Sequence, residues 1–166
     1  MKIGIIGDTH VGLRAKEIPK EFIDFFIKEK VDLIIHTGDI NEEIVLEELN
    51  KIAEVRAVKG NTDYLNLPKE LIFDLNGHKF FVFHSNVIIS RGDINKILEY
   101  VKKVKNVDPN FIIFGHVHYP VFTWKEGVFF VSPGTATGVR SGEIKKTIKS
   151  VAILDLDKLE VKFKII

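Results

Sequence analysis

The chain contains no cysteine, which excludes disulfide bonds, thiolate metal sites and cysteine nucleophiles. It has almost no excess charge either: the formal net charge is +1, so no overall field draws it to nucleic acid or to a membrane surface. No uninterrupted apolar run approaches the roughly 18 residues of a membrane-spanning helix. The apolar start of the chain is too short for a signal peptide and lacks a cleavage site of small residues. We therefore expect a cytoplasmic protein that binds neither a membrane nor a long nucleic acid.

What the chain does have is the composition of a globular protein with a core, 45% hydrophobic and 28% charged residues. No repeat, low-complexity segment or linker interrupts it, so residues 1–166 are expected to form a single domain. In the first half, β-branched runs alternate with helical periodicity. The expected strands are Lys2–Gly7, Leu33–His36 and Val55–Lys59, and the expected helices are Ile18–Lys30 and Ile44–Ile52. This order predicts parallel strands joined by crossover helices.

The second half has a different pattern. Asn76-Gly77, the strongest short hairpin signal, separates the predicted strands Leu71–Leu75 and Lys79–Phe83. A helix is expected over Ile94–Lys105, with an apolar face formed by Ile97, Leu98, Val101 and Val104. The remaining expected strands are Phe111–Phe114, the hairpin Val121–Trp124 with Val128–Val131, and the hairpin Val151–Asp155 with Glu160–Ile165. A parallel half followed by an antiparallel half predicts an α/β fold of two mixed sheets packed face to face, with helices outside.

Residues that can bind metal ions follow five of the predicted strands. They are Asp8 and His10, Asp39, Asn61, His84, and His116 with His118. In open α/β sheets the carboxyl edge of the strands is where ligands bind. Each motif alone is weak evidence, because a short Gly-Asp or Gly-Asn is more often a plain turn and a lone histidine is more often a satisfied core residue. Together and in this order they predict a metal site.

The predicted donor set suits transition metals. Four imidazoles among seven ligands favour manganese, nickel, iron, cobalt or zinc over magnesium or calcium, and manganese is our first expectation. Two carboxylates facing two divalent ions would leave a surplus of about two positive charges, which suits a hydroxide and an anionic phosphate ester.

The motifs Asp8-x-His10, Gly38-Asp39, Gly60-Asn61-x-Asp63, His84 and Gly115-His116-x-His118 resemble the signature of the calcineurin-like metallophosphoesterases. The short length and the stretch Val131-Ser132-Pro133-Gly134-Thr135, with Arg140 beyond it, are similar to the small prokaryotic YfcE-like phosphodiesterase branch, and we expect an archaeal member. The resemblance runs from Gly4 to Arg140. It implies a four-layer α-β-β-α sandwich, the metallophosphoesterase fold.

The resemblance also implies a division of the ligands between two metal ions. One ion would be bound by Asp8, His10, Asp39 and His118, and the other by Asp39, Asn61, His84 and His116. Asp39 would bridge the two, and a hydroxide bridging the ions would attack phosphorus. We therefore expect a phosphodiesterase, a hydrolase of small phosphate esters, in which Asp39, Asn61 and His84 are catalytic as well as ligands.

Two positions depart from the family pattern. Thr62 occupies the place of a family histidine that helps to protonate the leaving oxygen, so one candidate general acid is missing. His84-Ser85 stands where many members have His-Gly, which we expect to alter only the shape of the loop.

Three further residues are candidates near the site. His36, three positions before Asp39, could hydrogen-bond a metal-bound carboxylate or cap the buried end of a strand. Asp63 is expected to orient the loop that carries Asn61 rather than to bind metal. Arg140 could contact the substrate phosphate or be a surface arginine.

Other functions stay open from the sequence. A protein-binding scaffold of the same fold, a retromer subunit, also resembles this branch but has a degraded metal site, and Thr62 is the one feature that leans that way. Within the enzyme class, a phosphomonoesterase and a nuclease are alternatives, and the absence of a basic stripe counts against the nuclease. The sequence does not decide between a monomer and a homo-oligomer.

Overall fold

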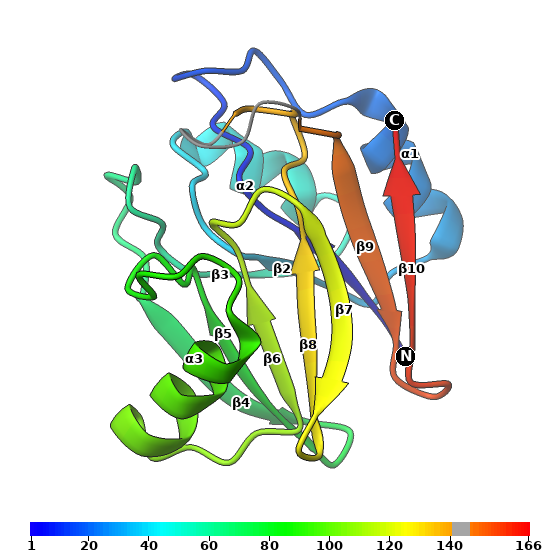
Figure 1. Cartoon of the computed structure of the whole chain (residues 1–166). Helices are drawn as coiled ribbons and strands as arrows, with labels where there is room; N and C mark the ends of the chain where they lie inside the picture. Colours follow the sequence, from blue (N-terminus) through cyan, green and yellow to red (C-terminus); the bar gives the residue numbers. More distant parts are fainter. Residues whose placement is uncertain (141–146) are drawn as a thin grey trace.

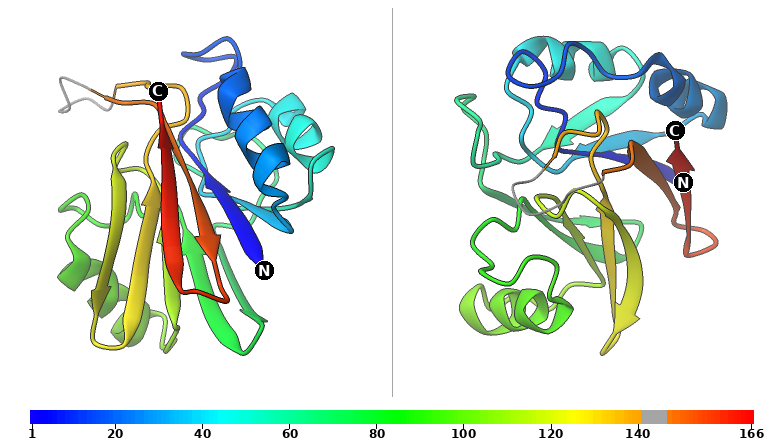
Figure 2. Two further views of the ribbon diagram at one scale, coloured as in Figure 1. Left: turned by 90° about the vertical axis from the view of Figure 1, so that its right-hand side faces the viewer. Right: turned by 45° about the horizontal axis from the view of Figure 1, so that its top comes forward.

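The computed structural model describes residues 1–140 and 147–166. Two five-stranded mixed sheets lie face to face, and helices cover their outer faces (Figures 1 and 2). The predicted four-layer α-β-β-α sandwich is therefore confirmed. Within the described part of the chain, no helix is long and apolar enough to cross a membrane.

The first sheet has the strand order β10-β9-β1-β2-β3. Its central strands β1 (Lys2–Ile6), β2 (Leu33–His36) and β3 (Glu54–Ala57) are parallel. Helices α1 (Lys20–Glu29) and α2 (Glu43–Asn50) make the crossovers between them, as the alternating periodicity predicts. The C-terminal hairpin, β9 (Ser150–Asp155) with β10 (Glu160–Ile165), joins the same sheet antiparallel to β1.

The second sheet has the order β4-β5-β6-β8-β7. Its strands are β4 (Glu70–Leu75), β5 (His78–Phe83), β6 (Phe111–Phe114), β7 (Pro120–Lys125) and β8 (Val128–Pro133). The strands β5, β6 and β8 run parallel, with antiparallel β4 and β7 at the edges. The β4–β5 turn contains Asn76 and Gly77 at φ 48° and 78°, the two positive angles that a tight hairpin requires, so the predicted hairpin is confirmed.

The predicted helix over residues 94–105 is only partly right. The α-helix α3 spans Ile94–Glu99 and continues as a π-helix, η1 (Tyr100–Val104). In the π-helix, the amide of Lys105 donates to the carbonyl of Tyr100, five residues back, at 3.0 Å. This wider turn rotates Val104 away from the sheet, and Val104 is 67% exposed although the α-helical spacing predicts it to be buried.

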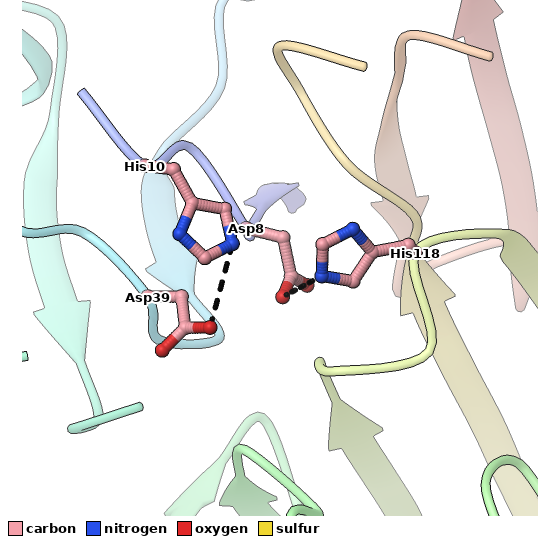
Figure 3. A group of neighbouring side chains, drawn as sticks. All are labelled: Asp8, His10, Asp39 and His118. Carbon is pink, nitrogen blue, oxygen red and sulfur yellow. Dashed lines mark ion pairs between the residues drawn. The ribbon is translucent and has the colours of Figure 1, made fainter. Parts of the chain in front are cut away.

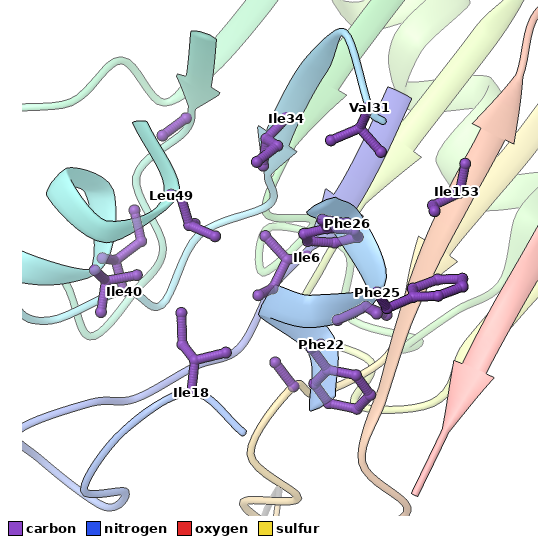
Figure 4. Close-up of a cluster of buried hydrophobic side chains, with 14 of the residues drawn as sticks. Ile6, Ile18, Phe22, Phe25, Phe26, Val31, Ile34, Ile40, Leu49 and Ile153 are labelled. Atoms are coloured by element: carbon purple, nitrogen blue, oxygen red, sulfur yellow. The ribbon is translucent and has the colours of Figure 1, made fainter. Parts of the chain in front are cut away.

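The side chains of β1 show how the alternation of a strand divides the core. Ile3 and Ile5 point into the layer between the sheets, where they pack with Phe80 of β5. Ile6 points to the opposite face and packs under α1 against Phe26 (Figure 4). Because both faces of β1 are covered, the strand is apolar from Ile3 to Ile6, and the polar residues that follow it begin with Asp8.

Candidate metal centre

Four of the predicted ligands converge where β1, β2 and β6 end. Asp8 and His10 follow β1, Asp39 follows β2, and His118 follows β6. Their ligand atoms all lie within 4.8 Å of one another, and all four side chains are buried. Figure 3 shows the two aspartates and two imidazoles facing one another, with His118 Nε2 3.1 Å from Asp8 Oδ1 and His10 Nε2 3.4 Å from Asp39 Oδ2.

The other three predicted ligands form a second group around His84. His84 Nε2 is 3.4 Å from Asp39 Oδ2 and 3.1 Å from Asn61 Oδ1. The ring of His116 stands edge-on to that of His84, with the ring centroids 5.0 Å apart. One carboxylate oxygen, Asp39 Oδ2, is therefore 3.4 Å from a histidine of each group.

Two of the histidines are held in one tautomer by backbone carbonyls. His84 Nδ1 donates to the carbonyl of Thr37 at 2.8 Å, and His118 Nδ1 donates to that of Val139 at 2.6 Å. A carbonyl only accepts, so the proton of each neutral ring is on Nδ1 and the lone pair is on Nε2, which faces a carboxylate. Metal-binding histidines are oriented in the same way in proteins.

The charges and unpaired polar atoms of this cluster suit a bound cation. Burial lowers the pKa of His84, but the hydrogen bond to Asp39 and the charges of Asp8 and Asp39 outweigh it and raise the pKa to about 9. Asp8 Oδ1 and His10 Nε2 are buried without a hydrogen bond in the described part of the protein, which is costly for polar atoms. One divalent transition-metal ion would satisfy both atoms, and a second would take the place of the proton of His84, so the donor set fits the predicted group.

The backbone of the ligand residues is in an unusual conformation. Asp8, His10, Asp39, His116 and His118 have φ angles of 48°, 48°, 56°, 73° and 60°. Left-handed backbone costs roughly 1–2 kcal/mol for a residue with a side chain, although aspartate and histidine adopt it more readily than most. Such strain is typical of functional sites. Here it bends each loop, so that residues two apart point into one cavity.

The family is decided by comparison with known proteins. Residues 1–159 match the model of the calcineurin-like phosphoesterase superfamily domain. This chain belongs to that superfamily. The chain is 42% identical over 163 residues to a probable metallophosphoesterase of Methanocaldococcus jannaschii, across 98% of this chain and 80% of the relative. It is 34% identical to a probable metallophosphoesterase of Methanothermobacter thermautotrophicus, across 95% of this chain and 87% of that protein. The predicted family is confirmed.

Solved structures agree with this assignment. The chain superposes on a structure described as a novel archaeal phosphodiesterase with a TM-score of 0.76 and 27% identity, covering all of both chains. It also superposes on the zinc complex of Vps29 from Entamoeba histolytica with a TM-score of 0.86 and 24% identity, covering 100% of this chain and 98% of the other. The second likeness concerns the fold alone.

Two glycines let the loops that carry the predicted ligands touch. Gly38 has a φ of 98°, and a Cβ placed there would lie 2.8 Å from the amide nitrogen of Gly60. A Cβ on Gly60 would in turn collide with the backbone and carboxylate of Asp39. The loops after β2 and β3 are therefore packed backbone to backbone, and this contact fixes Asp39 beside Asn61.

Asp63 connects the same two loops through its carboxylate. It accepts hydrogen bonds from the amides of Asp39 (2.9 Å), Ile40 (2.7 Å), Asn41 (2.8 Å) and Gly60 (2.7 Å). The sequence assigns it to the loop of Asn61 alone, whereas three of its four partners lie in the loop of Asp39.

His36 is fully buried and, among the described residues, makes no hydrogen bond to a carboxylate, in contrast to one of the two expectations. Its Nδ1 accepts a hydrogen bond from the amide of Gly38 at 3.2 Å, so its proton is on Nε2, which lies 3.2 Å from Thr9 Oγ1. Burial lowers the pKa of His36 to about 4, so the ring is neutral. His36 thus connects the loop after β1 to the loop after β2 through Thr9, a residue to which the sequence gives no role.

Thr62 lies at the boundary between the two ligand groups. Its amide donates to Asp39 Oδ1 at 2.9 Å, and its hydroxyl is 3.5 Å from His10 Nδ1 and 3.1 Å from Asn41 Nδ2. Arg140 is exposed, and the recorded contact of this residue is made by its backbone carbonyl, which accepts from Arg14 at 3.5 Å. Thr37 and Val139 act only through backbone carbonyls, which no sequence motif reveals.

Proposed function

We propose that this protein is a phosphodiesterase that hydrolyses small phosphate diesters with two divalent transition-metal ions. The position of Asp39 carries the proposal, since Asp39 Oδ2 lies 3.4 Å from a histidine nitrogen of each ligand group. When bound, such ions activate water and neutralise the charge that develops on the phosphoryl oxygens. Manganese is the first expectation, with nickel, iron, cobalt and zinc as alternatives.

The residues of the chain would have three tasks in this reaction. Asp8, His10, Asp39 and His118 would hold one ion, and Asp39, Asn61, His84 and His116 the other. Asp63, Thr37 and Val139 orient these ligands through the hydrogen bonds described above. Thr62 stands where a general acid would be useful, but a threonine hydroxyl is too weak an acid to protonate a leaving oxygen.

A protein-binding scaffold is the second candidate, supported by the likeness in fold to Vps29. The two candidates differ in what they require of the site. A scaffold has no physical need for strained, buried aspartates and histidines at one sheet edge, whereas a hydrolase has.

The test is a matrix of metals and substrates on protein first stripped of metal by a chelator. The protein is reconstituted with each of the five metals, and bound metal is counted by elemental analysis. Rates are measured on an aryl phosphodiester, an aryl phosphomonoester and a cyclic nucleotide. We expect two ions per chain and a higher kcat/KM for the diester than for the monoester. A single bound ion would contradict the dinuclear site, a preference for the monoester would make it a phosphomonoesterase, and inactivity with two bound ions would favour the scaffold.

Asp39→Asn supplies the sharpest control for that matrix. The amide keeps the shape of the side chain but removes the charge shared by the two ligand groups, so activity should fall by several orders of magnitude. Retention of more than about a tenth of the wild-type rate, a change of only about 1.4 kcal/mol in barrier, would contradict the bridging role. Asp24→Asn, on the exposed face of α1, is the matched substitution and should leave the rate unchanged.

A further inference from the structure

A cleft of about 360 Å³ opens directly beside the ligand group of His84. Its walls come from the loop after β3, the start of β4, the end of β5 and the π-helix η1. The polar residues that line it include Lys59, Lys69, Glu70, His84, Tyr100 and Lys105. His84 therefore belongs both to the candidate metal centre and to the wall of the cleft.

The lining of this cleft is positively charged. Lys105 Nζ lies 2.8 Å from a carboxylate oxygen of Glu70 and 5.6 Å from the centre of the Tyr100 ring, so its charge is balanced. Lys59 and Lys69 have no acidic partner within ion-pair distance in residues 1–140 and 147–166. Because the formal net charge of the molecule is only +1, two lysines without an acidic partner in one cleft form a local concentration of positive charge.

The two lysines are held next to each other by the backbone. The amide of Lys59 donates to the carbonyl of Pro68 at 2.7 Å, and Lys69 is the residue after Pro68. On the opposite wall, the ring of Tyr100 stacks on the buried ring of Phe83, with centroids 5.7 Å apart. One wall of the cleft is therefore fixed by a backbone hydrogen bond and the other by a stack of two aromatic rings.

We propose that this cleft binds a second anionic group, a phosphate, of substrates whose ester phosphate lies at the metal centre. The inference rests on the proposed function and narrows its substrate class to small esters that carry two phosphates, such as nucleotide diesters with a further phosphate. Lys59 and Lys69 donate hydrogen bonds to the second phosphate, and each such charged bond typically contributes a factor of about 10 to 100 in affinity.

The experiment compares thymidine 3′,5′-bisphosphate with thymidine 5′-monophosphate, which differ by one phosphate. Binding to the manganese-loaded protein is measured by calorimetry, so that the readout does not depend on turnover. We expect the bisphosphate to bind at least about tenfold more tightly. The advantage should disappear in the Lys59→Gln/Lys69→Gln variant and persist in Lys28→Gln, an exposed lysine of α1. Lys69→Arg keeps the charge and should retain the advantage. An equal affinity for the two nucleotides in the wild type would overturn the proposal.

A second experiment uses p-nitrophenyl esters of the 5′-phosphate of the same two nucleotides. It distinguishes failure of the anion subsite from failure of the proposed function. Hydrolysis of both esters with equal kcat/KM would overturn the anion subsite and leave the phosphodiesterase intact. A calorimetric advantage of the bisphosphate without hydrolysis of either ester would overturn the phosphodiesterase and leave the subsite intact. Circular dichroism shows whether the double variant is folded. If it is not, the binding advantage of the bisphosphate is measured instead in Lys69→Arg and in each single lysine variant, and that comparison decides the outcome.

Discussion

The two ligand groups that share Asp39 differ in their access to solvent. Asp8, His10 and His118 are almost completely buried, as is His84 of the other group, whereas His116 is half-buried and Asn61 is exposed. The segment after β8 also holds the loop of the buried group, since Thr135 Oγ1 donates to the carbonyl of Asp8 and Thr137 Oγ1 to that of Thr9, both at 2.8 Å. The open group borders the lysine-lined cleft instead. If the proposed ions are bound, we expect the buried group to hold its ion more tightly and the open group to face the substrate.

The largest expected effect comes from replacing one histidine of each ligand group and comparing the two variants. His118→Asn should weaken the binding of one ion by about a hundredfold or more, since even residues that merely orient a ligand contribute about 10- to 100-fold. It also leaves Asp8 buried without its imidazole partner, so the free energy of unfolding should fall. His116→Asn should weaken only the other ion and leave unfolding nearly unchanged. Chelator competition and urea unfolding measure both effects, and equal losses in the two variants would remove the distinction between the groups.

A smaller effect on stability is expected from the protonation of His36, which connects the loops after β1 and β2 through Thr9. In the folded protein the pKa of His36 is lowered from 6.5 to about 4 by burial. Between these values the unfolded chain binds a proton that the folded protein excludes, so stability falls as pH decreases from 6.5 to 4. The loss is at most about 3 kcal/mol.

The measurement is urea unfolding of metal-free protein across this pH range, for the wild type and for His36→Asn. The asparagine can still accept the hydrogen bond from Gly38 but does not titrate. The wild type should therefore lose more stability on acidification than the variant. Parallel pH profiles would show that His36 is not the group responsible.

The smallest effect is expected at Thr62, on the boundary between the groups. Thr62→His would place an imidazole beside Asp39 and supply the missing general acid, and general acids contribute about 10²–10⁴-fold at best. We expect a gain of roughly tenfold for diesters with alkyl leaving groups, and little gain for aryl diesters, whose leaving oxygen needs no proton. The measurement is kcat/KM along a series of diesters of rising leaving-group pKa. Equal slopes for wild type and variant would mean that the proton comes from elsewhere.

The sequence predicts those parts of the fold and site that depend on local pattern. Asn76-Gly77 determines its hairpin through two positive φ angles, and the placement of Asp8, Asp39 and His84 after strand ends predicts one shared edge. The end of the predicted helix could not be foreseen, because the shift to a π-helix at Tyr100 depends on packing against the second sheet.

Contacts between segments that are distant along the chain could not be predicted from the sequence either. His36 and Thr9 are 27 positions apart, and neither belongs to a motif that indicates their contact. Nothing in the sequence distinguishes Lys59 and Lys69 from other surface lysines. Their two segments are brought together by the hydrogen bond from the amide of Lys59 to the carbonyl of Pro68. Asp63 could be assigned to the nearer loop by its position, but its three bonds to the loop of Asp39 arise only from the close approach of two glycines.

The left-handed backbone of five ligand residues has a consequence for the evolution of this chain. A native domain is stable by only about 5–15 kcal/mol, and five such residues at roughly 1 kcal/mol each amount to a sizeable part of that margin. Glycine at these positions would relieve the strain and remove the ligands at the same time. Such a replacement has two opposing effects, because it relieves the strained backbone but also removes buried contacts such as that of His118 with Asp8. A lineage with no need for these ligands would therefore lose His116, which is only half-buried, at the least cost in stability.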